Sequence, residues 1–115
     1  MINYKLQNDR LVFELSGELG MFSVSKFNEV FATALEETSN YEVVMDLKQL
    51  EVMDSCGLGA MVSALKMVNA HGGFIHLARM KAGIMELLYL TKLKKRFSLF
   101  TSLEDALVAP PRLPL

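Results

Sequence analysis

The sequence has few of the residues that carry metal or redox chemistry: one cysteine and two histidines among 115 residues. The single cysteine, Cys56, excludes an internal disulfide and fits a reducing compartment. The histidines, His71 and His76, do not cluster with it in the sequence, which argues against a metal site. We therefore expect no resident metal and no cofactor.

Long apolar runs and an excess of charge of one sign are also missing. No apolar stretch approaches the ~18 residues that a bilayer-spanning helix needs, and the first residues lack the apolar core of a signal peptide. Lys and Arg number 12 against 13 Asp and Glu, a formal net charge of −1, which argues against general binding of nucleic acid or anionic membranes. We expect a cytoplasmic protein with no membrane span and no direct nucleic-acid contact.

Apolar residues, in contrast, are abundant. They make up 51% of the chain against 22% charged residues, which is enough for a globular core, and the length is that of one domain. We expect this domain to cover residues 1–109. A proline-rich, non-helical tail with Pro110, Pro111 and Pro114 should follow over residues 110–115.

The spacing of apolar residues predicts strands that alternate with helices, after an initial hairpin whose turn lies at residues 8–10. Strands joined by helices pair in parallel through right-handed crossovers. We therefore expect one α/β domain, a mixed β-sheet with about four helices packed mainly on one face. The expected strands are 4–6, 11–15, 43–52, 74–78 and 97–100, and the expected helices are 24–38, 57–69, 82–90 and 103–108.

The most informative stretch is residues 53–59, M-D-S-C-G-L-G, where an apolar strand gives way to a helix. The first N–H groups of a helix lack backbone partners and the helix dipole is positive there, so this place favours an anion. Ser55 brings a hydroxyl to it, with the acid Asp54 beside it. A phosphate would fill it either as a bound anion or covalently attached to Ser55.

A purely structural role is the alternative for the same residues. Asp54 or Ser55 would then cap the helix by accepting a hydrogen bond from an N–H two or three residues on, and local chemistry alone favours this interpretation. The two roles are compatible, because capping uses a lone pair and leaves the hydroxyl reactive. Gly57 and Gly59 remove side chains that would crowd a molecule approaching the backbone.

Catalysis by Cys56 is a weaker hypothesis. A helix N-terminus lowers the pKa of a thiol, but a cysteine nucleophile also needs a well-placed base. His71 lies at the far end of the expected helix and His76 lies within a strand. We expect Cys56 to be a small buried residue. The neighbours of Ser55 do not match the nucleophile elbow of hydrolases, and the glycines complete no nucleotide-binding motif, so we expect no enzyme.

One run of charge stands out, formed by Lys92, Lys94, Lys95 and Arg96. The simpler interpretation is a solvated turn, with cations at a helix C-terminus. The functional interpretation is an edge of a partner-docking surface.

The stretch 53–59 resembles the signature of the anti-sigma-factor antagonist family, the STAS domain, in which Asp-Ser-(Ser/Thr)-Gly-Leu-Gly follows an apolar strand. Residues 15–19, L-S-G-E-L, resemble the family's Leu-x-Gly-Glu-(Leu/Ile), and the similarity extends at consistent spacing over roughly residues 3–108. Two positions differ from the family pattern: Cys56 replaces a second hydroxyl residue, and Gly20 stands where an acid is usual. Further matches are the strand segment 44–47, the turn and strand at 72–77, and the last strand and helix at 97–107.

The resemblance implies a phosphorylation-controlled switch in which the serine after the signature aspartate, here Ser55, is the phosphoacceptor. Such an antagonist, when unphosphorylated, binds an anti-sigma factor that is also its serine-protein kinase, and a metal-dependent serine phosphatase restores it. We also predict that Gly57→Val blocks phosphorylation while the fold is retained. The candidate partner-binding residues are Asp54, Ser55, Cys56, Gly57, Gly20, Met21, Phe22, Ser63 and Met67.

A second function fits the same resemblance. The chain would then be a STAS scaffold or regulatory subunit of a larger assembly, acting through protein or small-ligand binding without a sigma factor.

Overall fold

The chain opens with a β-hairpin. In the computed structural model, which describes residues 1–111, β1 (Ile2–Gln7) pairs antiparallel with β2 (Arg10–Leu19). Asn8 and Asp9 form the turn with φ of 54° and 61°. Two successive positive φ angles are typical of the tight turns that join hairpin strands, and Asn and Asp tolerate them. The predicted hairpin is confirmed, although Arg10 belongs to the strand.

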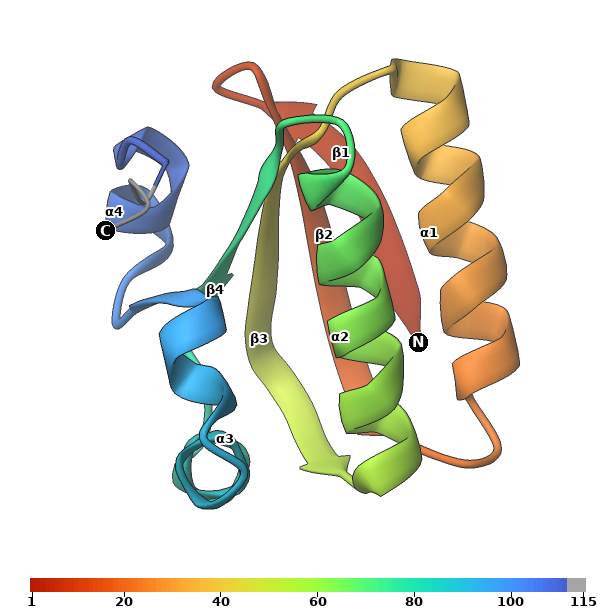
Figure 1. The fold of residues 1–115 in the computed structure, drawn as a ribbon, viewed down its shortest axis with the longest axis vertical. Helices are drawn as coiled ribbons and strands as arrows, with labels where there is room; N and C mark the ends of the chain where they lie inside the picture. The colour runs from red at the N-terminus through yellow and green to blue at the C-terminus, as the bar shows by residue number, and fades with distance from the viewer. Residues whose placement is uncertain (112–115) are drawn as a thin grey trace.

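Three parallel strands extend the sheet to the order β1-β2-β3-β4-β5 (Figure 1). The mixed α/β sheet is thus confirmed, and the short 3₁₀ helix η1 is an addition to the predicted elements. The strands are β3 (Glu42–Met53), β4 (Phe74–Ala78) and β5 (Ser98–Phe100). The helices are α1 (Val24–Thr38), α2 (Ser55–Asn69), α3 (Ala82–Leu90), η1 (Leu93–Arg96) and α4 (Leu103–Val108).

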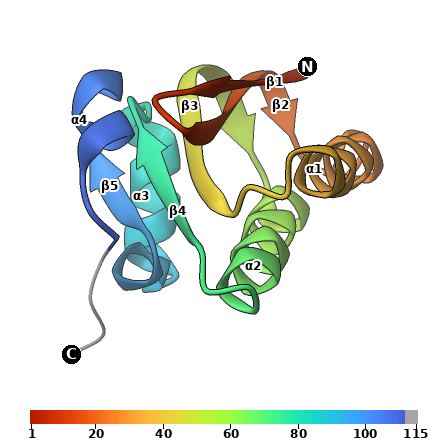
Figure 2. The ribbon, with the colours of Figure 1, turned by 90° about the horizontal axis from the view of Figure 1, so that it is seen from above.

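Helices cover the two faces of the sheet unequally. Successive strand residues point to opposite faces, so Phe13 and Met45 join the main core with α1, α2 and α3, whereas Val12 and Val44 face the other way. There they pack under α4, which contributes Ala106. Figure 2 shows α1 and α2 on one side of the sheet and α4 on the other. The prediction that the helices pack mainly on one face is therefore confirmed.

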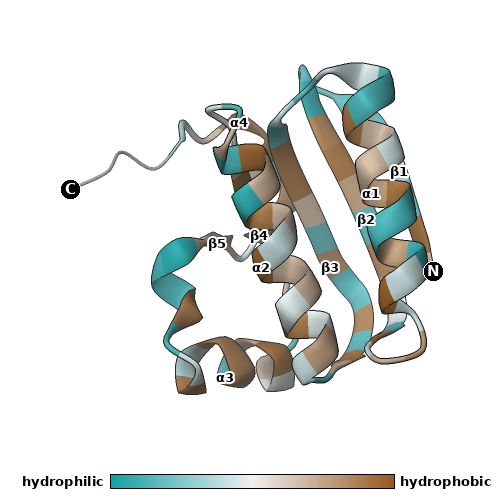
Figure 3. Cartoon of the chain, turned by 45° about the vertical axis from the view of Figure 1, so that its right-hand side comes forward, coloured by the Kyte–Doolittle hydropathy of each residue, from teal (hydrophilic) through white to brown (hydrophobic). Residues whose placement is uncertain are grey.

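The carboxyl ends of β2 and β3 lie side by side. Their pairing continues to Leu19 opposite Met53, after two irregularities in register. β3 extends well beyond its pairing with β4, which ends at Asp46. Residues 43–47 of β3 are buried and mostly hydrophobic, whereas most of the residues after them are exposed, a change visible in Figure 3. The loops that follow β2 and β3 therefore meet at one edge of the sheet, where sites of open α/β sheets lie.

Within residues 1–111, no helix has both the length and the apolar character that a membrane span requires. Pro110 and Pro111 follow α4 outside any helix, as expected for the start of the tail. Pro114 lies outside the described residues, so the predicted tail is described only in part.

Candidate functional site

Asp54 begins α2. Its Oδ1 accepts a hydrogen bond from the Gly57 N–H at 2.9 Å, and its carbonyl accepts one from the Leu58 N–H at 2.9 Å. This is the geometry of an N-cap residue. Capping therefore belongs to Asp54, and Ser55 is the exposed first residue of the helix, with its hydroxyl outside the cap.

Asp54 also fastens the loop that follows β2. Its Oδ2 accepts a hydrogen bond from the Met21 N–H at 3.1 Å, and its own N–H donates to the Leu19 carbonyl at 3.3 Å. The Gly57 N–H and, to a smaller extent, the Met21 N–H lower the pKa of the Asp54 carboxyl, because both favour its charged form. An ionised carboxylate thus joins the ends of two strands at the start of a helix.

Gly20, where the STAS pattern has an acid, lies directly against this carboxylate. A Cβ at Gly20 would lie 2.5 Å from Asp54 Oδ2 and 2.8 Å from its Cγ. The Asp54 side chain therefore fills the space that a side chain at position 20 would need. An acid at position 20 would also bring two carboxylates together, which disfavours ionisation of both.

Gly57 is required by the fold. It is buried, and a Cβ there would lie 1.9 Å from the Leu19 carbonyl oxygen and 2.7 Å from its carbon. These are backbone atoms of β2, so they have little room to move. The prediction that Gly57→Val leaves the fold intact is wrong, because the group that approaches Gly57 is the protein's own strand. Gly59 differs: it is exposed, and a Cβ there would meet nothing within 4 Å.

Cys56 is exposed, so the prediction of a buried cysteine is wrong. The helix begins at Ser55, two residues earlier than predicted, and this places Cys56 in its first turn and off the side that faces the sheet. His71 stacks on Tyr41 beyond the opposite end of α2, and His76 lies in β4 on the sheet face beneath α4. The buried side of α2 consists of Gly57, Leu58, Ala60, Met61, Ala64, Leu65 and Val68.

The outward side of α2 brings other predicted residues into line with Cys56. Ser63 and Met67 follow it by seven and eleven residues, which is close to two and three helical turns. All three are exposed, Met67 by 41%. They form one solvent-facing stripe that starts beside Ser55.

Apolar side chains project around the loop after β2. Met21 is 66% exposed and Phe22 is 96% exposed, and Val52 at the end of β3 is 52% exposed. Val52 was not among the predicted site residues. The sign that could have identified it is an apolar residue in the part of β3 that extends beyond its pairing with β4. These side chains border a surface hollow of about 260 Å³, lined by Glu18, Leu19, Gly20, Met21, Phe22, Ser23, Val52 and Asp54.

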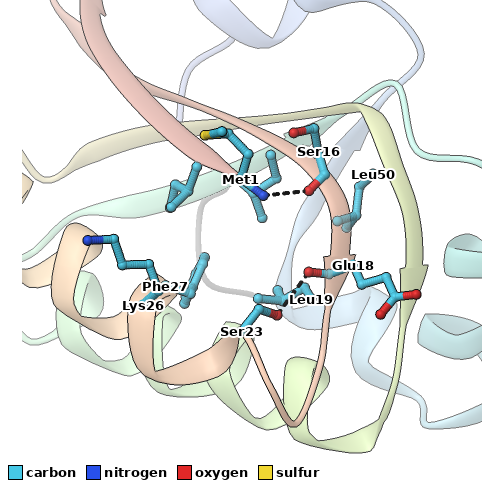
Figure 4. Close-up of a pocket in the computed structure, with 10 residues that line it drawn as sticks. Met1, Ser16, Glu18, Leu19, Ser23, Lys26, Phe27 and Leu50 are labelled. Atoms are coloured by element: carbon cyan, nitrogen blue, oxygen red, sulfur yellow. Dashed lines mark hydrogen bonds between the residues drawn. The ribbon is translucent and has the colours of Figure 1, made fainter.

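A second, smaller cavity of about 50 Å³ lies between the start of β1, the second half of β2 and α1 (Figure 4). The Met1 amino group donates to the Ser16 carbonyl at 2.8 Å along its rim, and Ser23 donates to Glu18 O at 2.9 Å. Ligand sites typically occupy 300–1,000 Å³. This surface hollow is therefore small for a ligand site.

The fold and the site define the class of protein: a small α/β domain of STAS type. Its features are a five-stranded mixed sheet and a third strand that leads into an acid-capped helix with an exposed serine. The model of the STAS domain matches residues 1–106, and the chain belongs to this family.

Relatives of similar length carry related names. The anti-sigma-B factor antagonist of Bacillus subtilis (strain 168) is 27% identical over 93 residues, which cover 81% of this chain and 84% of that protein. The anti-sigma F factor antagonist of Paenibacillus polymyxa is 28% identical over 97 residues, covering 84% of this chain and 83% of that protein.

Solved structures share the fold. An anti-sigma factor antagonist from Mycobacterium paratuberculosis superposes with a TM-score of 0.85 at 23% identity, covering 95% of this chain and 92% of that one. The Bacillus protein SpoIIAA in its phosphorylated form gives a TM-score of 0.72 at 19% identity, covering 92% of this chain and 96% of that one.

Proposed function

We propose that this chain is a cytoplasmic anti-sigma factor antagonist controlled by phosphorylation of Ser55. In the unphosphorylated form it binds an anti-sigma factor that is also its serine kinase, and phosphorylation releases it. A metal-dependent serine phosphatase returns it to the binding form. The observation that carries the proposal is the exposed Ser55 hydroxyl at the first position of α2, next to an aspartate that already caps the helix.

The charges around Ser55 explain how a phosphoryl group would act. It adds about −1.5 to −2 charges beside the ionised Asp54. The positive end of the α2 dipole favours this charge, so the domain itself tolerates it. A partner that covers Met21 and Phe22 would have to desolvate a dianion next to apolar surface. A loss of about 2–4 kcal/mol of binding energy corresponds to roughly 30- to 1,000-fold weaker affinity.

The proposed contact surface combines the Ser55 region with the stripe along α2. Gly20 and Gly57 shape it by letting the loop and the helix approach each other, without offering side chains. The side chains offered to the partner are those of Asp54, Ser55, Cys56, Met21, Phe22, Ser63 and Met67.

Phosphate mapping tests the proposal. Incubation with the cognate kinase and ATP should add one phosphoryl group to the unaltered protein and none to Ser55→Ala. The expected site, Ser55, is read from peptide masses. Phosphate on Ser63, Ser23 or Thr91 would contradict the proposal, which assigns the phosphoacceptor role to Ser55 alone.

The second candidate, a STAS regulatory subunit of a larger assembly, has one observation in its favour. The same fold forms part of a much larger protein, the murine anion transporter Slc26a9, where the match covers 86% of this chain but 17% of that one, with a TM-score of 0.74. A kinase and a phosphatase encoded beside this chain's gene would favour the switch. A pull-down that returns a stable assembly regardless of Ser55→Asp would favour the subunit.

A further inference from the structure

α3 leaves much of its apolar surface uncovered. Its sequence is AGIMELLYL, yet the fully buried residues are Ile84 and Leu88. Tyr89 and Leu90, at the end of the helix, are 52% and 74% exposed. Single exposed apolar residues are ordinary on protein surfaces, whereas adjacent large ones form a patch that a partner can cover.

Cations surround this patch. Lys92, Lys94, Lys95 and Arg96 lie within the six residues that follow α3, in a chain whose net charge is −1. The Lys94 Nζ lies 4.1 Å from the centre of the Tyr89 ring, so basic and aromatic surface are continuous. Lys92 and Arg96 are exposed. We call Tyr89, Leu90, Lys92, Lys94 and Arg96 the α3–η1 surface.

Support of the helix end does not account for these cations. The last carbonyls of α3 already have partners: the Thr91 N–H and hydroxyl both donate to the Leu87 carbonyl, at 3.1 and 2.7 Å. The Lys92 N–H donates to the Tyr89 carbonyl at 3.1 Å. The Leu87 and Tyr89 carbonyls therefore do not need the head groups of Lys92, Lys94 or Arg96 as caps.

The α3–η1 surface continues from a helix that starts at the Ser55 end of the molecule. The Lys81 Nζ donates to the Lys48 carbonyl at 2.5 Å and pairs with Glu51 at 3.2 Å, which fixes the start of α3 to the last part of β3. β3 then leads into Asp54. Figures 1 and 3 show α3 and the first turn of α2 at the same end. One partner can therefore reach both regions.

We propose that the α3–η1 surface is a second contact for the partner that phosphorylates Ser55, and that it receives an acidic segment carrying an apolar pocket for Leu90. The inference rests on the proposed function, because it concerns the same partner. Clustered cations accelerate encounter with an acidic surface and fix its orientation. Tyr and Arg are the residue types that interfaces favour, and Leu90 supplies the projecting apolar group.

The local charges favour a protein partner over an anionic bilayer. Glu86 is exposed on α3 itself, and Glu51 and Asp54 lie at the same end of the fold. A flat anionic membrane would meet these carboxylates together with the cations, whereas a shaped acidic segment can contact the cations alone.

Charge reversal at Arg96 tests the inference, with Lys5→Glu as the matched control. Lys5 lies on β1 and pairs with Glu14 at 3.4 Å, and its reversal changes the net charge equally.

Leu90→Ser tests the apolar contact, with Val108→Ser on α4 as its control, since Val108 is similarly exposed. Calorimetry at about 50 and 300 mM salt gives the Kd for the kinase, and phosphorylation of Ser55 gives KM and kcat.

Arg96→Glu should raise Kd and KM about fivefold or more at low salt, with kcat unchanged, and the effect should shrink at high salt. Leu90→Ser should weaken binding at both salt concentrations. Equal Kd values for Arg96→Glu and Lys5→Glu would overturn the inference. So would variants that bind the kinase normally but lose binding to phosphatidylcholine–phosphatidylglycerol vesicles. If the kinase binds but leaves Ser55 unmodified, the proposed function fails, and the Kd comparison still decides the role of this surface.

Discussion

Two polar regions of the molecule can be compared: the Ser55 region at the carboxyl ends of β2 and β3, and the face of the sheet beneath α4. Different kinds of hydrogen bond hold them together. In the Ser55 region, the Asp54 carboxylate accepts hydrogen bonds from the backbone N–H groups of Gly57 and Met21. On the face beneath α4, side chains pair with each other and with carbonyls. Asp46 binds both Nε and Nη2 of Arg79 there.

The face beneath α4 is buried as well as paired. Arg10 donates to the Ala106 carbonyl at 2.8 Å and also to the Ala109 carbonyl, and its guanidinium lies 4.9 Å from the centre of the Phe74 ring. The His76 Nδ1 lies 3.1 Å from the same Ala106 oxygen. The Arg10 guanidinium and the His76 Nδ1 thus contact backbone carbonyls of α4 and the residue after it, whereas the buried His76 Nε2 has no hydrogen-bond partner among the described residues. In the Ser55 region, backbone N–H groups bind a single side chain, that of Asp54, so the other side chains remain at the surface for a partner.

The glycines of α2 give the largest expected effect. Gly57→Val should lower the free energy of unfolding by about 3 kcal/mol or more, because even a Cβ collides with the Leu19 carbonyl. Gly59→Ala is the control and should raise stability by up to ~1 kcal/mol, since alanine favours an exposed helix. Urea unfolding measures both. A stable Gly57→Val protein would mean that β2 and α2 are not tightly packed there.

Breaking the Asp46–Arg79 pair should give the second-largest loss of stability. Asp46→Ala leaves a partly buried guanidinium without its carboxylate, and should cost about 2–3 kcal/mol. Glu14→Ala, which breaks the exposed pair with Lys5, should cost less than about 1 kcal/mol. Arg79→Ala and the double variant complete the cycle. If Asp46→Ala costs no more than Glu14→Ala, side-chain pairing does not hold this face.

The stability of the protein should depend on pH because of His76. Burial lowers the pKa of His76, and the nearby Arg10 charge adds to this, whereas the hydrogen bond to Ala106 opposes it. As pH falls, His76 therefore takes up a proton in the unfolded chain before it does so in the folded protein. The free energy of unfolding should fall as pH drops below about 6.5, by at most ~1.4 kcal/mol per pH unit. The fall should end once the pH is below the pKa of His76 in the folded protein.

Urea unfolding at pH 7 and 5.5 tests this, because most carboxylates stay ionised over that window. His76→Asn keeps a donor for the Ala106 carbonyl and should remove most of the slope. His71→Gln is the control at an exposed position and should keep the slope. A slope that vanishes with His71→Gln instead would contradict the account.

The comparison of the two regions also shows what the sequence can reveal. Residues 53–59 are contiguous, so their pattern identified the end of the strand and the serine at the strand-to-helix junction, although it placed the helix start two residues too late. The Asp46–Arg79 pair spans 33 residues and the Arg10–Ala106 bond spans 96, so no local pattern marks either. Strands and helices followed apolar spacing closely, except that η1 has only four residues, too few to show a period.

Two predictions in the Ser55 region were wrong, for different reasons. The role of Gly57 depends on how closely β2 approaches α2, which is a property of tertiary packing. The exposure of Cys56 depends on where the helix starts, and capping by Asp54 moves that start to Ser55. A contact between β2 and α2 therefore decided the role of Gly57, whereas a local cap decided the exposure of Cys56.

The central claim is that charge at Ser55 weakens partner binding without disturbing the fold. The direct measurement compares the unphosphorylated and fully Ser55-phosphorylated proteins for affinity to the anti-sigma factor and for thermal unfolding, with kinase-treated Ser55→Ala as the control. We predict roughly 30- to 1,000-fold weaker binding, with stability changed by no more than ~1–2 kcal/mol. The control should bind as the unphosphorylated protein does. Equal affinity of the two forms would contradict the account.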